Sequence, residues 1–280
     1  MHEKISESLA GRAYFYTLLP LSIKELKTAD LLLATPEDQL VKGFYPKVYA
    51  PNIEHKDYYD NYISTYVERD IRTIKNIDNI LTFKKFMLLC ALRVGTTINF
   101  TDLATNCGIS MSTAKSWLSL LQTSFVVFEL SSYPKNLGKR ITKSPKLYFY
   151  DVGLALALMG IDKETVIAKR DLYGALFENM IIVDVIKNCF ANNIRSNLTF
   201  FRDTNQNEID LIMEVNGRTI PVEVKATQTI QSSFFKTIEW FNTETKNEEP
   251  GIVVFGGDAN QTRTKAQIVS WKNIEQIIGL

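Results

Sequence analysis

The clearest hydrophobic pattern in the chain is an alternation of apolar and charged positions over two short runs joined by Asn216-Gly217. Asn-Gly between two β-rich runs is typical of a two-residue type I′ hairpin. With these residues in the loop, Val215 pairs with Arg218, and the register of the hairpin follows. One face is then wholly apolar and pairs Met213 with Ile220, Leu211 with Val222, and Ile209 with Val224.

The opposite face of this hairpin carries charge, because Asp210 lies opposite Glu223 and Glu208 lies opposite Lys225. Like charges opposed at about 5 Å between Cβ atoms destabilise a sheet. A divalent cation would offset the repulsion, since hard cations take carboxylate oxygens. The alternative is a solvated face on which the repulsion is screened, with a weak surface ion pair between Glu208 and Lys225.

A third acid, Glu178, lies in a run with helical spacing over residues 173–187. The apolar stripe of this predicted helix contains Tyr173, Leu176, Phe177, Met180 and Ile181. Glu178 lies off the stripe, but its neighbours three, four and seven positions ahead are also apolar. A buried carboxylate needs a partner or a shifted pKa. A buried arginine or a backbone N–H could satisfy it without chemistry, and Asp184 is a competing acid in more polar surroundings.

Further alternating runs surround these elements and extend the predicted sheet. We expect strands at residues 198–202, 208–215, 219–226, 251–255 and 267–270, and an amphipathic helix at 230–241. The helix at 173–187, the first four of these strands and the helix between the third and the fourth give the order α-β-β-β-α-β, and the last strand follows it. The fold class predicted for the chain is therefore mixed α/β.

The ordered set of a helical Glu178, a strand Asp210, and then Glu223 and Lys225 on the next strand resembles the PD-(D/E)XK restriction-endonuclease-like fold. The resemblance implies that these four residues are catalytic, that Asp210 and Glu223 hold Mg²⁺ or Mn²⁺, and that the reaction is hydrolysis of DNA. The sequence departs from the family pattern because Ile209, and not proline, precedes the aspartate. A non-catalytic DNA-binding or scaffolding module with a vestigial nuclease core is the alternative.

Four longer blocks resemble a large bacterial and archaeal ATPase family in which an AAA-type module precedes "domain of unknown function 4143". They are SLAGRAYFYTLLPLSIKEL, YYDNYISTYVERDI, ISMSTAKSWLSLLQTSFVVFEL and KSPKLYFYDVGLALALMG. The chain has no G-x-x-x-x-G-K-[ST] sequence, so we expect no nucleotide site and no ATPase activity from it. Arg12 matches a block near the end of the ATPase module. A second alternative is therefore a truncated protein that needs an AAA-type ATPase module from another chain.

Residues 80–160 show the spacing of a winged-helix domain. Helices are expected at 81–94, 101–107 and 112–123, with wing strands at 125–130 and 146–150. We expect phosphate contacts from Lys115 on the presumed recognition helix, and from the basic residues Lys135, Lys139, Arg140, Lys143 and Lys146 between the strands. A protein-interaction platform with a solvated basic loop is the alternative.

These patterns divide the chain into four predicted segments. The first contains a strand-like run at 13–19 and a helix that begins after Ser22, where Ser22-Ile-Lys-Glu25 forms a capping box. The second contains a tyrosine-rich helix at 55–74. The segments are 1–40, resembling the end of the ATPase module; 41–79, a helical connector; 80–160, winged-helix-like; and 161–280, nuclease-like.

Overall charge and cysteine content limit the compartment and the partners that we expect for the chain. The formal net charge is +1, so DNA binding would need a local basic patch. Three widely spaced cysteines, with no CxxC, indicate a reducing compartment. The polar start MHEKISES is not a signal peptide, and the longest apolar runs fall short of the ~20 residues that span a bilayer. We therefore expect a cytoplasmic protein with DNA and no membrane as its partner.

Overall fold

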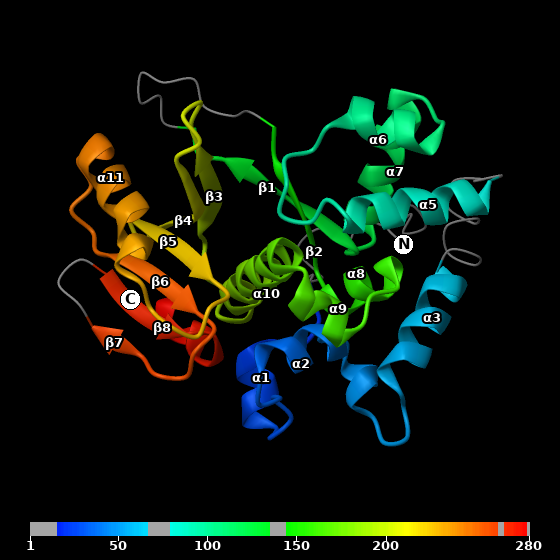
Figure 1. Cartoon of the computed structure of the whole chain (residues 1–280), viewed down its shortest axis with the longest axis horizontal. Helices are drawn as coiled ribbons and strands as arrows, with labels where there is room; N and C mark the ends of the chain where they lie inside the picture. Colours follow the sequence, from blue (N-terminus) through cyan, green and yellow to red (C-terminus); the bar gives the residue numbers. More distant parts are fainter. Residues whose placement is uncertain (1–15, 67–78, 135–143, 263–265, 279–280) are drawn as a thin grey trace, which may run out of the picture.

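The computed structural model of the chain describes residues 16–66, 79–134, 144–262 and 266–278. Its described part combines helices with one mixed sheet, so the predicted α/β class is confirmed (Figure 1). The strand order is β2-β1-β3-β4-β5-β6-β8-β7. The strands are β1 Val127–Ser132, β2 Lys146–Phe149, β3 Asn197–Arg202, β4 Glu208–Val215, β5 Arg218–Lys225, β6 Gly251–Phe255, β7 Gln261–Thr262 and β8 Ala266–Ser270.

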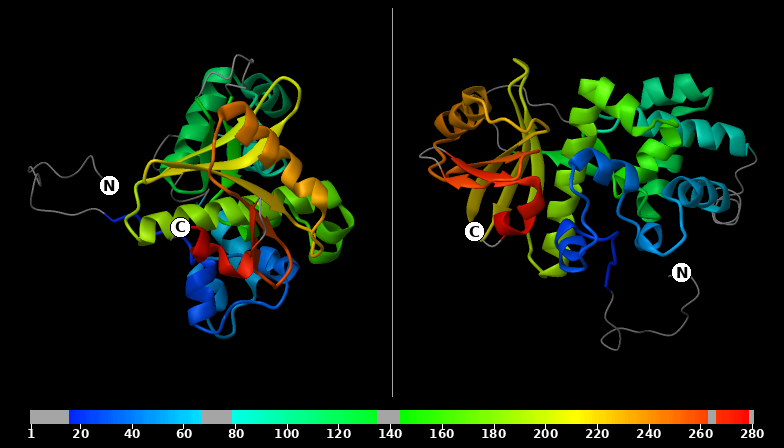
Figure 2. Two further views of the ribbon diagram at one scale, coloured as in Figure 1. Left: turned by 90° about the vertical axis from the view of Figure 1, so that its left-hand side faces the viewer. Right: turned by 60° about the horizontal axis from the view of Figure 1, so that its bottom comes forward.

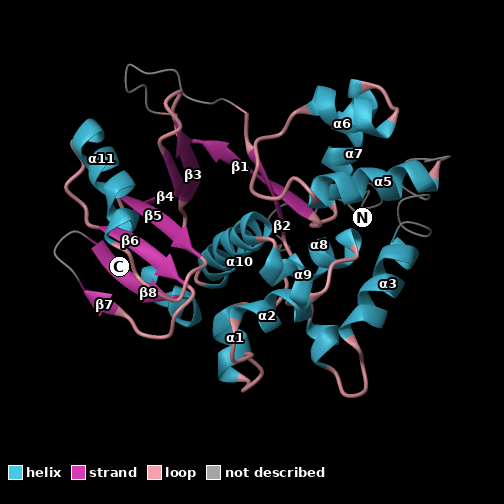
Figure 3. Ribbon diagram, viewed as in Figure 1, coloured by secondary structure: helices cyan, strands magenta, loops and turns pink. Residues whose placement is uncertain are grey.

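Most of the helices gather beside the β2–β1 end of the sheet, as Figure 3 shows. The α-helices are α1 Ile23–Thr28, α2 Pro36–Lys42, α3 His55–Thr65, α5 Ile80–Ala91, α6 Phe100–Cys107, α7 Met111–Thr123, α8 Val152–Met159, α9 Lys163–Ala168, α10 Arg170–Ala191 and α11 Lys236–Thr245. Short 3₁₀ segments are η2 Pro46–Tyr49, η4 Ser232–Phe235 and η5 Trp271–Ile277. Within the described ranges, none of these helices combines the length and apolar character needed to cross a membrane.

The predicted β4–β5 hairpin forms in the expected register. Val215 pairs with Arg218, and the ladder continues to the pair of Leu211 and Val222. Asn216 and Gly217 have φ angles of 52° and 79°. Both residues of a type I′ turn need positive φ, which explains why Asn-Gly is found here.

One pair of the predicted apolar face is wrong, because Ile209 does not share a face with Val224. Ile209 packs with Ile212 in one apolar cluster, whereas Val224 belongs to the other. The β3–β4 register shifts between Thr199 and Phe201, which pair with Ile212 and Ile209 respectively. This irregularity adds one residue to β4, and an added residue reverses the face of every side chain beyond it.

The two faces of the sheet are covered by different helices. Helix α10 packs against β5 and β2, and α11 packs against β4 and β5. Figure 2 shows the two helices on opposite sides of the strands. Phe177 of α10 and Phe241 of α11 are both fully buried, one in each apolar cluster. Because α10 is covered by the sheet on one side and by α2, α8 and α9 on the other, a polar residue in its middle needs a partner inside the protein.

The expected helix–turn–helix is present as α6 and α7, which follow α5. Gly108 ends α6 in the left-handed conformation, with φ 71°. The predicted wing strands β1 and β2 pair in antiparallel fashion. However, β1 also pairs in parallel with β3, through Ser131 with Thr199 and Ser132 with Phe200. The sheet therefore runs continuously across the boundary expected between residues 160 and 161.

The N-terminal elements follow the prediction in part. The capping box forms, with Ser22 N donating to Glu25 Oε2 at 2.7 Å and Glu25 N donating to Ser22 Oγ at 3.2 Å. Residues 16–19 are irregular and not a strand, whereas the rest of that run, with Arg12, lies outside the described residues. Helix α1 packs against η5, where Lys27 Nζ lies 2.7 Å from Glu275 Oε1.

Candidate metal and phosphodiester site

Asp210 and Glu223 lie together where β4 and β5 part at the open end of their hairpin. They are 8% and 2% exposed. Val224 N donates to Asp210 Oδ2 at 2.8 Å. The β4–β5 ladder ends at Leu211 and Val222, so beyond it this backbone N–H is bonded by a side chain. Lys225 Nζ donates to Glu223 Oε2 at 2.6 Å and lies 3.7 Å from Asp210 Oδ2. The structure thus brings together the three residues that the hairpin register predicted.

Glu223 has one carboxylate oxygen without a donor. Its Oε1 atom is buried and has no hydrogen-bond partner, while Oε2 is held by Lys225. Burial, then the charge of the neighbouring Asp210 carboxylate and a hydrogen bond with it, raise the pKa of Glu223 to about 8 against the opposing effect of Lys225. A buried acceptor that lacks a donor is costly, so this oxygen is available to a ligand that brings positive charge.

Glu178 projects from α10 and is 16% exposed. Tyr148 Oη donates to its Oε1 atom at 2.5 Å, and Lys146 Nζ donates to the same atom at 3.0 Å. Burial and then the charge of Asp210 raise the pKa of Glu178 to about 7, while Lys146 acts in the opposite direction. The partner of this acid is therefore a lysine and a tyrosine of β2, and neither the arginine nor the backbone N–H considered from the sequence.

Lys146 is the residue of the cluster that the sequence did not reveal. It was expected in an exposed basic loop, but its side chain is 2% exposed and forms ion pairs with both Glu178 and Glu208. Its ammonium also lies 5.4 Å from the centre of the Phe200 ring. Burial works to lower the pKa of Lys146, but the surrounding carboxylates outweigh it and raise that pKa. The sequence signal for a buried Lys146 was its position as a single lysine directly before the apolar run Leu147–Tyr150.

Of two other expectations about acids, the one for Glu208 is wrong and the one for Asp184 is confirmed. Glu208 does not pair with Lys225, because it forms its ion pairs with Lys146 and with Arg202, whose Nε lies 3.3 Å away. Asp184 is buried, at 1% exposed, and its surroundings are polar as expected, because Asn188 Nδ2 donates to its Oδ2 at 2.9 Å and the charge of Lys187 acts on it. Its Oδ1 accepts from the N–H of Ile23 at 2.7 Å, and burial raises its pKa to about 6. Asp184 therefore anchors α1 to α10.

The residues predicted to contact DNA are only partly described. Lys115 is exposed on α7, where its Nζ lies 5.6 Å from the centre of the Phe100 ring. Lys135, Lys139, Arg140 and Lys143 lie outside the described residues.

Asp210 and Glu223 are the residues that fit a divalent cation. In the described part of the chain, no three His, Cys, Asp or Glu side chains are grouped as metal ligands. The donor set is instead two carboxylates, and the unpartnered Glu223 Oε1 is the observation that fits a cation. Hard cations such as Mg²⁺ complete their shell with water and substrate phosphate, so two protein carboxylates are sufficient ligands.

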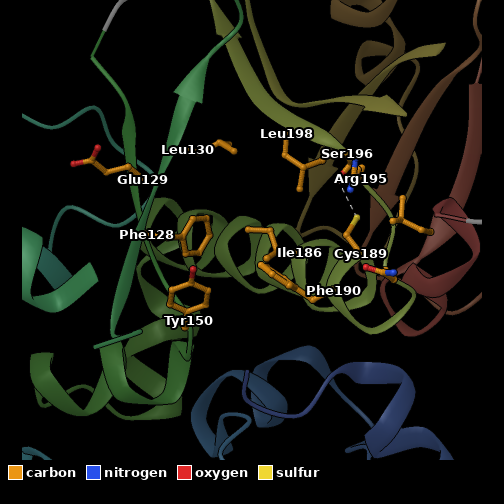
Figure 4. A pocket seen from close by; sticks show the side chains of 12 residues that line it. Phe128, Glu129, Leu130, Tyr150, Ile186, Cys189, Phe190, Arg195, Ser196 and Leu198 are labelled. Atoms are coloured by element: carbon orange, nitrogen blue, oxygen red, sulfur yellow. Dashed lines mark hydrogen bonds between the residues drawn. The ribbon is translucent and has the colours of Figure 1, made fainter. Parts of the chain in front are cut away.

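A separate pocket of about 540 Å³ lies between the C-terminal half of α10 and strands β1 and β3 (Figure 4). Its walls include Phe128, Ile186, Phe190 and Leu198. The four residues Glu178, Asp210, Glu223 and Lys225 take no part in its lining. This largely apolar pocket does not suit a phosphate, and we do not assign the chemistry to it.

Comparison with known proteins identifies relatives of undefined activity. Two uncharacterized proteins, from Mycobacterium tuberculosis and Mycobacterium bovis, are each 29% identical over 225 residues. The match covers 80% of this chain and 49% of each relative, so the chain spans about half the length of the curated relatives it matches. No solved structure matches the chain.

Two family models match different segments. Residues 34–165, which include Lys146 and Tyr148, match a domain of unknown function, DUF8612. Residues 173–274 match DUF4143, a domain of unknown function, which confirms the expected resemblance to that domain over the segment that carries Glu178, Asp210, Glu223 and Lys225.

Proposed function

We propose that this chain is a DNA-interacting protein with a metal-dependent phosphodiesterase site formed by Asp210, Glu223, Lys225 and Glu178. The observation that carries the proposal is the buried Glu223 Oε1, which has no donor and lies in a carboxyl group beside that of Asp210. Like charges of this kind persist in a folded protein when a cation or a proton offsets them.

Each side chain has a distinct role in this proposal. Asp210 and Glu223 would hold Mg²⁺ or Mn²⁺, which supplies a bound water of lowered pKa and polarises the phosphate. Lys225, held by Glu223 Oε2 at 2.6 Å, places an ammonium beside the reacting phosphate and stabilises the charge that develops there. Glu178, fixed by Tyr148 and Lys146, contributes a negative charge that orients the attacking water.

The first test is calorimetric titration of Mn²⁺ into the chain and into Asp210→Asn. We expect binding in the unaltered chain and none in the variant, because one of the two ligands loses its charge. Asp38→Asn is the matched control, since Asp38 forms a half-exposed pair with Lys163, a residue outside the proposed site, and its substitution should leave binding unchanged.

The second test is cleavage of a panel of linear, nicked and branched DNA with Mg²⁺. Asp210→Ala should abolish cleavage while the circular dichroism spectrum stays that of the unaltered chain. Full cleavage by this variant would reject the proposed site.

A second candidate function is a DNA-binding or scaffolding module whose nuclease-like core is vestigial. The observation that favours it is that lysines already bind the acids: Lys225 holds Glu223, and Lys146 holds Glu178. Retained DNA binding in a chain that binds no Mn²⁺ would support this candidate over the first.

A further inference from the structure

One buried cation of the candidate site, Lys146, lies outside residues 173–274, the segment that carries the acids. Lys146 begins β2, and Tyr148 follows two positions later, so both side chains leave the strand on the same side. Both donate to Glu178 Oε1, from 3.0 Å and 2.5 Å. β2 reaches the acids because β1 joins it to β3 in the same sheet. The two segments with separate family matches therefore build one site.

The ammonium of Lys146 lies between carboxylates of two different elements. Glu178 comes from α10 and Glu208 from β4, and Lys146 forms an ion pair with each. The lysine is 2% exposed, so little water screens this attraction. Carboxylates that converge from separate elements on one point are what a hard divalent cation requires, and here an ammonium lies at that point.

A charge count shows how many further cations the cluster needs. Among the described residues, four carboxylates (Glu178, Glu208, Asp210 and Glu223) meet three cations (Lys146, Lys225 and Arg202). With all groups ionised, one net negative charge remains. One divalent ion converts this to a net positive charge, which suits a phosphate, whereas two ions would leave a large uncompensated positive charge before substrate binds.

We infer that Lys146 takes the place of a second metal ion, so that the candidate site works with one divalent cation held by Asp210 and Glu223. This inference rests on the proposed function. Lys146 is a positioning residue in it: the lysine keeps Glu178 and Glu208 from acting as metal ligands and holds Glu178 toward the water.

The test is the number of Mn²⁺ ions bound, measured by calorimetry and by the electron paramagnetic resonance of spin-coupled Mn²⁺ pairs. The unaltered chain should bind one ion and give no pair signal. Lys146→Met should bind two ions and give the signal of a coupled pair, because Glu178 and Glu208 lose the ammonium between them and keep only Tyr148 and Arg202 as partners. Lys146→Arg should restore one ion, since its guanidinium can bridge the same carboxylates.

Lys163→Met is the matched control. Lys163 forms an ion pair with Asp38 that is far more exposed than the Lys146 cluster, so this variant should bind one ion. A folded Lys146→Met that binds only one ion would overturn the inference. If Lys146→Met does not fold, the unaltered chain still tests the inference, because two bound ions in the unaltered chain would also overturn the inference. No binding in any of these proteins would instead overturn the metal site of the proposed function, and the inference with it.

Discussion

At the scale of single residues, the candidate site is a set of acids and lysines that are buried or half-buried. Glu223 is the member whose ionised form is least favoured, because burial and Asp210 both disfavour its charge and only Lys225 favours it. Such displaced pKa values cluster at functional sites, although ion-pair networks also produce them. The unpartnered Glu223 Oε1 is what separates this cluster from a fully satisfied network.

The raised pKa of Glu223 predicts how stability depends on pH. A carboxyl whose pKa is higher in the folded state than its unfolded value near 4.5 stabilises the fold at low pH, and this contribution disappears as pH rises through the folded value of about 8. The free energy of unfolding of the metal-free chain should therefore fall between about pH 4.5 and 8. Glu223→Gln should make this fall shallower, as urea unfolding across that range would show.

The control for this pH series is Glu249→Gln. Glu249 forms an ion pair with Arg218, and that bond lowers its pKa, so its titration lies below the pH window in question. The slope of stability against pH should be the same in this variant as in the unaltered chain. An unchanged slope in Glu223→Gln would show that Glu223 is already ionised without metal.

At the scale of elements, a glycine suits the backbone of the β4–β5 turn but weakens the backbone of helix α10. Gly217 has φ 79°, and a Cβ atom placed on it would meet open space. Gly174 lies inside α10, where a Cβ atom would also meet open space. Any change in stability on adding a methyl group at either position therefore comes from the backbone and not from packing.

Substituting alanine at these two glycines should change stability in opposite directions. Gly217→Ala should destabilise the chain by about 1 kcal/mol, because an L-residue is strained at positive φ. Gly174→Ala should stabilise it by up to about 1 kcal/mol, because alanine favours the helix over glycine. Thermal unfolding followed by circular dichroism measures both, and a midpoint that rises in Gly217→Ala would contradict the type I′ turn.

At the scale of the whole molecule, the sheet joins segments that the sequence pattern separates. β2 and β1 come from the winged-helix-like segment, and they continue into β3 to β8 through the parallel β1–β3 pairing. The same sheet brings Lys146 to the acids of the candidate site. A continuous sheet with shared buried residues predicts that both segments unfold together.

Calorimetry of two matched variants tests this cooperativity. Leu147 of β2 and Ile252 of β6 are each 1% exposed and lie on either side of the expected boundary. Replacing either by alanine should cost about 2–5 kcal/mol and lower the midpoint of one common transition. Two transitions, each moved by only one variant, would show that the segments unfold independently despite the shared sheet.

Much of the fold was predictable because it follows from local periodicity. The bounds of β4 and β6 agree with the apolar runs, and the hairpin register from Leu211 to Val215 follows from its turn. The face of Ile209 was not predictable, because the bulge that reverses it depends on the pairing of β4 with β3. The sequence offered a signal for Lys146 but not for its partners, because Glu178 and Glu208 lie on distant elements.

The sequence by itself determined that Asp210 and Glu223 lie close together, since a two-residue turn fixes the register as far as the adjoining pair of Leu211 and Val222. It also placed Glu178 on a helix that is apolar on nearly all sides. Only the tertiary structure decided which cations meet these acids. A lysine's position along the chain does not show whether its ammonium ends in water or between two buried carboxylates, because that depends on contacts formed by β2 across the whole sheet.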